Sequence, residues 1–166
     1  MRDLEQRLAA VRLVAFDVDG VFTDGRFYLA DNGIESKAFF TQDGFGIRRL
    51  LNADIAVAVI SGRRSGAVER RMSELGVSHV VQGCKDKVAA LDNIIGKLGI
   101  KQAECAYVGD DIPDLPLLSH VGVSIAVANA VPALPARCDI TTSAPGGRGA
   151  VREVCELLLA SQGKAS

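Results

Sequence analysis

The chain has little of what several common kinds of active site require. It has only two histidines, His79 and His120, which are isolated in the sequence and give little material for histidine-based catalysis or a zinc cluster. The four cysteines are scattered with no Cys-x-x-Cys pair, which is typical of reduced thiols in the cytoplasm. No apolar run approaches the ~20 residues that a membrane span needs. Histidine chemistry, a zinc site and a membrane partner are therefore not expected.

Positive and negative charges nearly balance. The chain has 19 Lys and Arg against 20 Asp and Glu, a net charge of −1, which argues against a nucleic-acid partner. Residues 1–7 are polar with no apolar core behind them, so no signal peptide is expected. With 166 residues, of which 48% are hydrophobic, the chain is expected to form one cytoplasmic domain over residues 1–166.

The order of the apolar segments predicts an α/β fold. The segment 55–60 is continuously apolar, which is typical of a parallel strand covered on both faces. From residue 44 onward strands alternate with helices, which predicts a Rossmann-like doubly wound parallel sheet. Asn32 and Gly33, between two apolar runs, predict a short β-hairpin flap over about 24–40. Strands are expected at 11–17, 55–60, 78–82, 104–109 and 122–127, and helices at 44–53, 64–75, 86–98, 111–119 and 149–161.

The most informative residues are Asp17 and Asp19, at the end of the first expected strand. Side chains two apart on a strand point to one face, so these carboxylates would lie about 6–7 Å apart. Their repulsion and loss of hydration make the pair costly. A divalent cation would relieve the repulsion, and an anion on that cation would lie within reach of a carboxylate nucleophile. The pair therefore predicts phosphoryl transfer.

Polar residues at other strand ends could serve the same chemistry. Ser61 and Asp110 each follow an expected strand, and Lys87 lies at the start of an expected helix. Ligands of open α/β sheets bind beyond the carboxyl ends of the strands. Taken singly, these residues are common in turns, helix caps and solvated helix faces. Their order and their placement at strand ends favour one shared site.

Each of these residues can be given a role. Asp17 would attack phosphorus to give an aspartyl-phosphate intermediate, and Asp19 would protonate the leaving oxygen and later deprotonate water. Ser61 and Lys87 would bind the phosphoryl oxygens. Mg²⁺ suits a site of oxygen ligands that keeps several waters. The expected metal ligands are Asp17, the backbone carbonyl of Asp19, and Asp110, with Asp111 and Asp114 in support and Asp114 able to orient Lys87.

This set resembles the haloacid dehalogenase superfamily of phosphatases. Its pattern is Asp-x-Asp-Gly, then Ser or Thr at a strand end, then Lys, then Gly-Asp-Asp-x-x-Asp, which match residues 17–20, 61, 87 and 109–114. Only the hairpin lies between the first acids and Ser61, so a large cap domain has no room. The site would then be open unless a neighbouring subunit covers it. The flap aromatics either favour such oligomerisation or pack within one subunit: Phe27, Tyr28, Phe39 and Phe40.

Over nearly its full length the chain is more closely similar to the 3-deoxy-D-manno-octulosonate 8-phosphate phosphatase family. The segments that carry the similarity are 16–25, 43–48, 61–63, 82–83 and 146–153. It implies a magnesium-dependent homotetramer without a cap, which hydrolyses a small phosphorylated sugar acid for lipopolysaccharide synthesis. Arginines suit the carboxylate of such a substrate. By matching position the implied substrate contacts are Phe40, Thr41, Gln42, Asp43, Gly44, Arg48, Arg63, Arg71 and Lys87, with Gln42 standing where the family pattern has arginine.

Several alternatives remain open. A related phosphatase could act on a nine-carbon keto sugar acid phosphate, although such relatives carry Glu in place of Arg63. A signalling receiver domain also uses magnesium and a phosphorylated Asp, but that Asp lies on a later strand. A catalytically silent scaffold is the third alternative. The loop at 145–149 either leads into the last helix or reaches the site of a neighbouring subunit.

Overall fold

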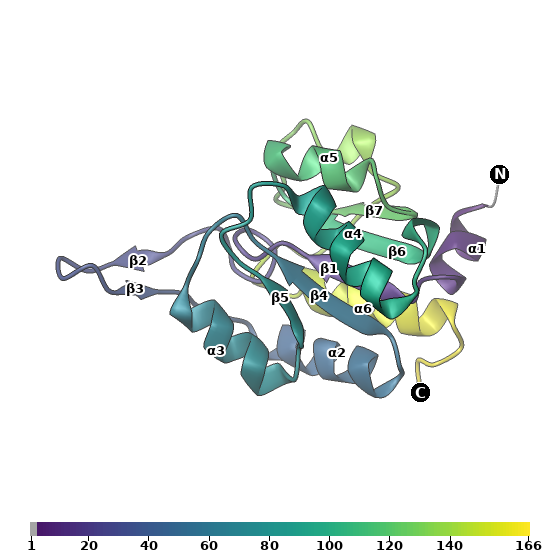
Figure 1. Ribbon diagram of the computed structural model, residues 1–166, viewed down its shortest axis with the longest axis horizontal. Coiled ribbons are helices and arrows are strands. Elements are labelled where there is room, and N and C mark those ends of the chain that lie inside the picture. The colour runs from purple at the N-terminus through teal and green to yellow at the C-terminus, as the bar shows by residue number, and fades with distance from the viewer. Residues whose placement is uncertain (1–2) are drawn as a thin grey trace.

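A six-stranded parallel sheet forms the centre of the computed structural model, which describes residues 3–166 (Figure 1). Met1 and Arg2, the start of the polar N-terminal segment, lie outside the described residues. The strand order is β5-β4-β1-β6-β7-β8, so the chain winds outward from β1 in both directions. This order confirms the predicted doubly wound, Rossmann-like class. The strands are β1 (Leu13–Phe16), β4 (Ala56–Ile60), β5 (His79–Val81), β6 (Cys105–Gly109), β7 (Val123–Ala126) and β8 (Ile140–Thr141).

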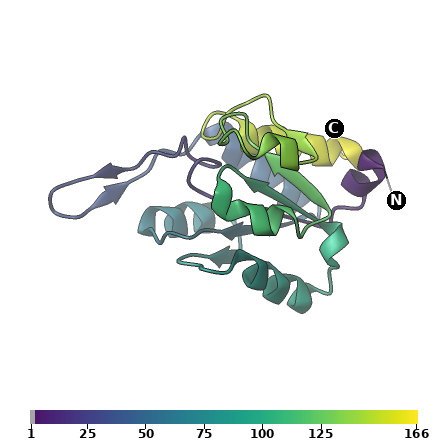
Figure 2. The ribbon, with the colours of Figure 1, turned by 90° about the horizontal axis from the view of Figure 1, so that it is seen from above.

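Helices cover both faces of the sheet because successive side chains of its central strands point to opposite sides. Val14 and Phe16 of β1 pack on the side of α1, α2, α3 and α6, whereas Leu13 and Ala15 pack on the side of α4 and α5. Figure 2 shows α6 and α4 on opposite sides of the sheet. The helices are α1 (Leu4–Ala9), α2 (Thr41–Asn52), α3 (Gly66–Leu75), α4 (Lys87–Leu98), α5 (Leu115–Leu118) and α6 (Ala150–Ser161), with 3₁₀ turns at Gln102–Glu104, Ile112–Asp114 and Pro135–Arg137.

Two elements were not expected from the sequence. The short helix α1 begins after Asp3, whose carboxylate accepts a hydrogen bond from the backbone N–H of Gln6 (2.8 Å). Strand β8 has two residues, and the preceding Asp139 bonds to Ser124 of β7 and to Arg7 of α1. Both elements are too short for a clear periodic pattern, so contacts between distant segments fix them.

The predicted hairpin is present but shorter than expected. Strands β2 (Tyr28–Leu29) and β3 (Glu35–Ser36) pair antiparallel, and the hairpin projects from the body of the molecule (Figure 1). At its turn Gly33 has a φ of +83°, and the Asn32 side chain accepts a hydrogen bond from the N–H of Ile34 (3.1 Å). The aromatic residues of the flap differ in burial, because Tyr28 is 68% exposed whereas Phe39 packs against the core.

No helix within residues 3–166 is long and apolar enough to cross a membrane.

Candidate active site

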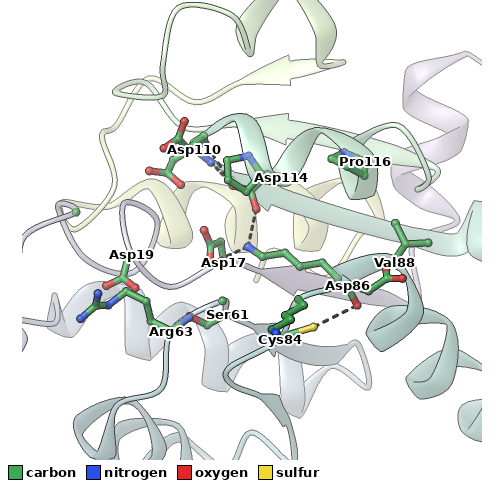
Figure 3. Close-up of a pocket in the computed structure, with 16 residues that line it drawn as sticks. Asp17, Asp19, Ser61, Arg63, Cys84, Asp86, Val88, Asp110, Asp114 and Pro116 are labelled. Atoms are coloured by element: carbon green, nitrogen blue, oxygen red, sulfur yellow. Dashed lines mark hydrogen bonds and ion pairs between the residues drawn. The ribbon is translucent and has the colours of Figure 1, made fainter.

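A cavity of about 580 Å³ lies at the carboxyl ends of the strands (Figure 3). Asp17 directly follows β1, Ser61 follows β4, Asp110 follows β6, and Lys87 is the first residue of α4. Parallel strands bring these ends to one edge of the sheet, beside the point where the strand order reverses. The structure therefore gathers into one cavity eight residues that the sequence singled out: Asp17, Asp19, Ser61, Arg63, Lys87, Asp110, Asp111 and Asp114.

Asp17 lies at the centre of the charged cluster and is only 9% exposed. One carboxylate oxygen, Oδ1, accepts a hydrogen bond from the backbone N–H of Val18 (2.8 Å) and lies 3.2 Å from the ammonium of Lys87. Burial and the nearby carboxylate of Asp114 raise the pKa of Asp17 to about 6, against the opposing effect of Lys87. Asp17 is thus ionised at neutral pH and, through its other oxygen, available as a nucleophile.

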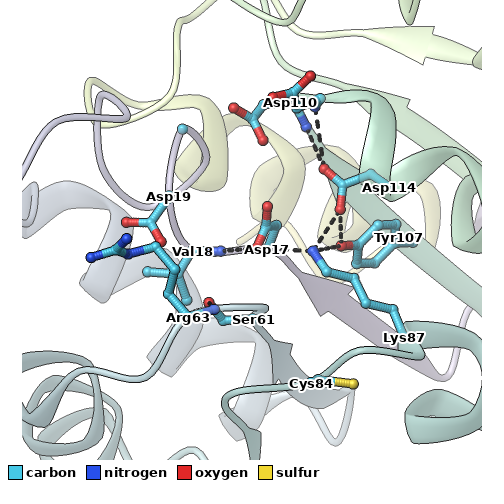
Figure 4. Close-up of polar contacts among 12 residues, drawn as sticks. Asp17, Val18, Asp19, Ser61, Arg63, Cys84, Lys87, Tyr107, Asp110 and Asp114 are labelled. Carbon is cyan, nitrogen blue, oxygen red and sulfur yellow. Dashed lines mark hydrogen bonds and ion pairs between the residues drawn. The ribbon is translucent and has the colours of Figure 1, made fainter.

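Lys87 is held by a second acid and a tyrosine (Figure 4). Its Nζ donates to Asp114 Oδ1 (2.7 Å) and to the hydroxyl of Tyr107 (3.2 Å), which itself donates to the same Asp114 oxygen (2.6 Å). Burial alone would lower the pKa of Lys87, but the carboxylates of Asp17 and Asp114 hold it above its usual value. Lys87 is therefore a fixed positive charge beside Asp17.

Three acids could hold a cation, but they differ in how many of their oxygens are already engaged in hydrogen bonds. Oxygens of Asp17, Asp110 and Asp114 lie within 4.8 Å of one another. Both oxygens of Asp114 are engaged, because Oδ2 accepts the backbone N–H groups of Asp110 (3.0 Å) and Asp111 (3.3 Å) while Oδ1 binds Lys87. Asp114 is thus an orienting group, which leaves Asp17 and Asp110 as the better metal ligands.

The negative charge of the Asp110 carboxylate is poorly compensated by its surroundings. Burial, followed by repulsion from Asp17 and Asp114, raises its pKa to about 8. A divalent cation among these oxygens would remove the repulsion. The all-oxygen donor set fits Mg²⁺, as the sequence predicted.

A loop of glycines holds the residues after β1 in place. Gly20 has a φ of +87°, and a Cβ there would collide with the carboxylate of Asp110. A Cβ on Gly146 would collide with the carbonyl of Gly20, and the N–H of Gly147 donates to the carbonyl of Val21 (3.1 Å). In this chain the 145–149 loop therefore packs against residues 20–24, which follow β1, as it leads into α6.

Asp19 lies on the hairpin side of the cavity. Its Oδ1 contacts the ammonium of Lys37, a residue just beyond β3. Arg63, which also lines the cavity, pairs with Glu35 of β3 (2.9 Å) and lies over the ring of Phe27 at 4.2 Å. The stem of the hairpin thus contacts both Asp19 and Arg63.

The other residues that the sequence predicted as substrate contacts are not among the described residues that line this cavity. Thr41 and Gln42 are exposed in the first turn of α2, which begins three residues earlier than expected. Arg48 donates to the carbonyl of Glu74 (3.4 Å), and the guanidinium of Arg71 pairs with the Glu74 carboxylate (3.5 Å). Other members of the set that lie outside the cavity lining are Phe40, Asp43 and Gly44.

Asp43 and Gly44 have clear packing roles. Asp43 is 1% exposed and accepts the backbone N–H of Arg152, in α6, at 3.0 Å. Burial raises its pKa to about 6. A Cβ on Gly44 would collide with the guanidinium of Arg71. These residues join α2 to α3 and α6.

Sequence reasoning missed three residues of the site. Tyr107 carried a usable signal, because a tyrosine in an otherwise apolar buried strand needs a partner for its hydroxyl. Lys37 and Glu35 gave none, since charged residues in a short hairpin are ordinarily solvated. Only the folded chain brings Lys37 against Asp19 and Glu35 against Lys37 and Arg63.

The fold and the site define the class of protein. A doubly wound sheet that presents Asp17, Ser61, Lys87 and Asp110 in one cavity is that of a haloacid dehalogenase-like hydrolase, and residues 73–152 match the family model of that description. The chain is 49% identical over 162 residues to the 3-deoxy-D-manno-octulosonate 8-phosphate phosphatase of Escherichia coli strain K12, covering 98% of this chain and 86% of that protein. The chain belongs to the 3-deoxy-D-manno-octulosonate 8-phosphate phosphatase family.

Solved structures agree with this assignment. The phosphatase of that name from Yersinia pestis superposes with a TM-score of 0.96 at 46% identity, covering 98% of this chain and 88% of that one. The one from Moraxella catarrhalis, in complex with magnesium, phosphate and a KDO molecule, gives a TM-score of 0.94 at 45% identity, with coverage of 97% and 92%.

Proposed function

We propose that this chain, acting as one phosphatase domain, hydrolyses 3-deoxy-D-manno-octulosonate 8-phosphate to the free sugar acid and inorganic phosphate. The observation that carries the proposal is the convergence of Asp17, Lys87 and Asp110 in one cavity of a chain that is 49% identical to a phosphatase of this substrate. We further propose that it works in the cytoplasm, in the supply of a lipopolysaccharide precursor.

The reaction would have two steps. In the first, a carboxylate oxygen of Asp17 bonds to phosphorus while the bond from phosphorus to the sugar oxygen breaks. The electron pair stays on the sugar oxygen, which takes a proton from Asp19. In the second, water bonds to phosphorus and gives a proton to Asp19, and the bond to Asp17 breaks to release phosphate. The ionised Asp17 suits the first step.

The residues around Asp17 would stabilise the charge on the phosphoryl group. Lys87 and the hydroxyl of Ser61 would bind its oxygens, with Asp114 and Tyr107 keeping Lys87 in place. Asp17, Asp110 and the backbone carbonyl of Asp19 would hold Mg²⁺. Bound there, Mg²⁺ would neutralise part of the charge of the acids and the phosphate.

Recognition of the sugar acid would begin at Arg63. This residue lines the cavity, and its side chain is 49% exposed. Its guanidinium can therefore bind the carboxylate of a substrate while it remains paired with Glu35. Thr41 and Gln42 are exposed but lie outside the cavity lining. In a homotetramer such residues could reach the substrate only from a neighbouring copy, and we propose that assembly for this chain.

A phosphate-release assay tests the proposal. The wild-type chain should hydrolyse the eight-carbon substrate with Mg²⁺ and lose activity when EDTA removes the metal. Asp17→Asn should lower kcat by at least about 10⁴-fold, because the amide is not a nucleophile, and should leave the circular dichroism spectrum unchanged.

The same assay decides between the alternatives. A higher kcat/KM on a nine-carbon keto sugar acid phosphate would replace the substrate assigned here. Absence of turnover on every phosphate ester with Mg²⁺ present would favour a receiver or scaffold role. Activity that persists in Asp17→Asn would show that the nucleophile is another residue.

A further inference from the structure

Lys37 joins the hairpin to the proton-transfer residue. Its side chain is 1% exposed, and its ammonium contacts Asp19 Oδ1 and lies 3.2 Å from Glu35 Oε1. The ring of Phe27 lies 5.7 Å from the same nitrogen. A buried ammonium is costly unless it is paired, so these two carboxylates and the ring constrain where Lys37 can lie.

Glu35 extends the same contacts to a second residue of the cavity. Its Oε2 accepts a hydrogen bond from Arg63 Nη2 at 2.9 Å. Although desolvation acts the other way, Lys37 and Arg63 hold the pKa of Glu35 below its usual value. Asp19, Lys37, Glu35 and Arg63 therefore form one chain of ion pairs, with a cavity-lining residue at each end.

We propose that Lys37 and Glu35 are positioning residues of the active site. Lys37 fixes the carboxylate of Asp19, and Glu35 fixes the guanidinium of Arg63. Neither of the two is among the described residues that line the cavity, so both act through their partners. The stem of the hairpin would in this way set where the proton-transfer group stands relative to the arginine that binds substrate. The inference rests on the proposed phosphatase function.

Two substrates with different leaving groups can distinguish an effect on the position of Asp19 from a general effect on the fold. An alkoxide leaving group, as in a sugar phosphate, needs a proton as the bond to phosphorus breaks. The 4-nitrophenolate ion is a stable anion and leaves without one. A misplaced Asp19 should therefore slow the first step, which kcat/KM reports, far more for a sugar phosphate than for 4-nitrophenyl phosphate.

The first experiment compares Lys37→Met with wild type on both substrates. We expect kcat/KM for the sugar phosphate to fall at least about 10-fold and kcat/KM for 4-nitrophenyl phosphate to change less than about threefold. In an Asp19→Asn background, Lys37→Met should change kcat by less than about twofold, because its partner is already disabled. Lys97→Met, on the exposed surface of α4, is the matched control.

The second experiment measures Glu35→Gln. The KM for the sugar acid phosphate should rise about 5- to 10-fold with kcat nearly constant, since a looser Arg63 binds the carboxylate less well. The KM for 4-nitrophenyl phosphate, which has no carboxylate, should stay the same. Glu69→Gln, exposed on α3, is the control.

The outcomes distinguish this inference from the proposed function. Equal losses of kcat/KM on both substrates in Lys37→Met, or additive effects with Asp19→Asn, would overturn the positioning role. A preference for another sugar phosphate would revise the substrate while leaving the leaving-group comparison valid. A wild-type chain that hydrolyses neither kind of ester would overturn the proposed function and this inference with it.

Discussion

At the scale of single residues, the site is built at the expense of stability. The oxygens of Asp17, Asp110 and Asp114 lie within 4.8 Å of one another, and among the described residues only Lys87 forms ion pairs with them. Burial and mutual repulsion raise the pKa of Asp110 to about 8. This loss of stability is linked to metal binding, because the repulsion among the carboxylates is what favours a divalent cation at the cluster.

Removing Asp110 should therefore stabilise the metal-free protein. Because the pKa of Asp110 is higher in the folded chain than in the unfolded chain, the wild-type protein loses stability as pH rises toward 8. A variant without this carboxylate does not have that loss. Asp110→Asn should raise the unfolding free energy by about 1 kcal/mol or more at pH 8.5 in EDTA. It should also abolish the rise in Tm on adding Mg²⁺.

Thermal unfolding with EDTA and with Mg²⁺ checks this expectation. Asp31→Asn, exposed at the tip of the hairpin, is the control and should keep the metal-dependent rise. A metal-dependent rise that survives in Asp110→Asn would mean that Asp110 is not a ligand.

At the scale of elements, the contact between α2 and α6 holds a buried acid. Asp43, in the first turn of α2, accepts the backbone N–H of Arg152 through Oδ1, while its Oδ2 is buried with no hydrogen-bond partner among residues 3–166. Burial raises the pKa of Asp43 from 3.8 to about 6. Between these values the folded state keeps a proton that the unfolded state releases, so stability falls as pH rises from about 4 to 6.

Asp43→Asn should remove this pH dependence. The amide keeps an acceptor for the N–H of Arg152 and carries no charge at any pH. Relative to wild type, the variant should gain about 2 kcal/mol of stability on going from pH 4 to pH 7. Urea unfolding of both proteins at the two pH values measures this difference, and an equal difference at both would show that Asp43 does not titrate near 6.

At the scale of the whole molecule, the hairpin is the most prominent surface feature. It projects from the body and carries four exposed large apolar side chains: Phe27 (39%), Tyr28 (68%), Leu29 (66%) and Ile34 (62%). The cavity it borders has no cap domain over it. Both features are suited to the homotetramer proposed above, in which the hairpins would bury these side chains against neighbouring copies.

The double substitution Tyr28→Ser and Leu29→Ser should weaken that assembly. Burying each side chain is worth about 1.5–3 kcal/mol, so the dissociation constant should rise roughly 100-fold or more. Light scattering coupled to gel filtration over a range of concentrations measures the mass. Leu98→Ser, at the end of α4, is the control. A wild-type chain that is monomeric at micromolar concentration would contradict the tetramer.

How much was predictable from the sequence differed between parts of the chain. The continuously apolar segment of β4 and the Asn-Gly turn predicted their elements, because local pattern and final structure agree there. The short elements α1 and β8 were missed, since distant partners such as Arg7 and Asp139 stabilise them. The start of α2 was placed three residues too late, since Phe40 at its N-cap makes no side-chain capping hydrogen bond that a sequence could signal.

The sequence by itself determined the sheet and the reaction centre. Residues that directly follow parallel strands must meet at one edge, so the positions of Asp17, Ser61 and Asp110 along the chain were enough to place them together. Tertiary structure decided which acid has its oxygens engaged by other groups, because the hydrogen bonds of Asp114 come from a strand, a helix and a turn. It also brought Lys37 against Asp19 and Glu35 against Arg63, since these contacts depend on where the stem of the hairpin lies relative to the ends of β1 and β4, which no local pattern encodes.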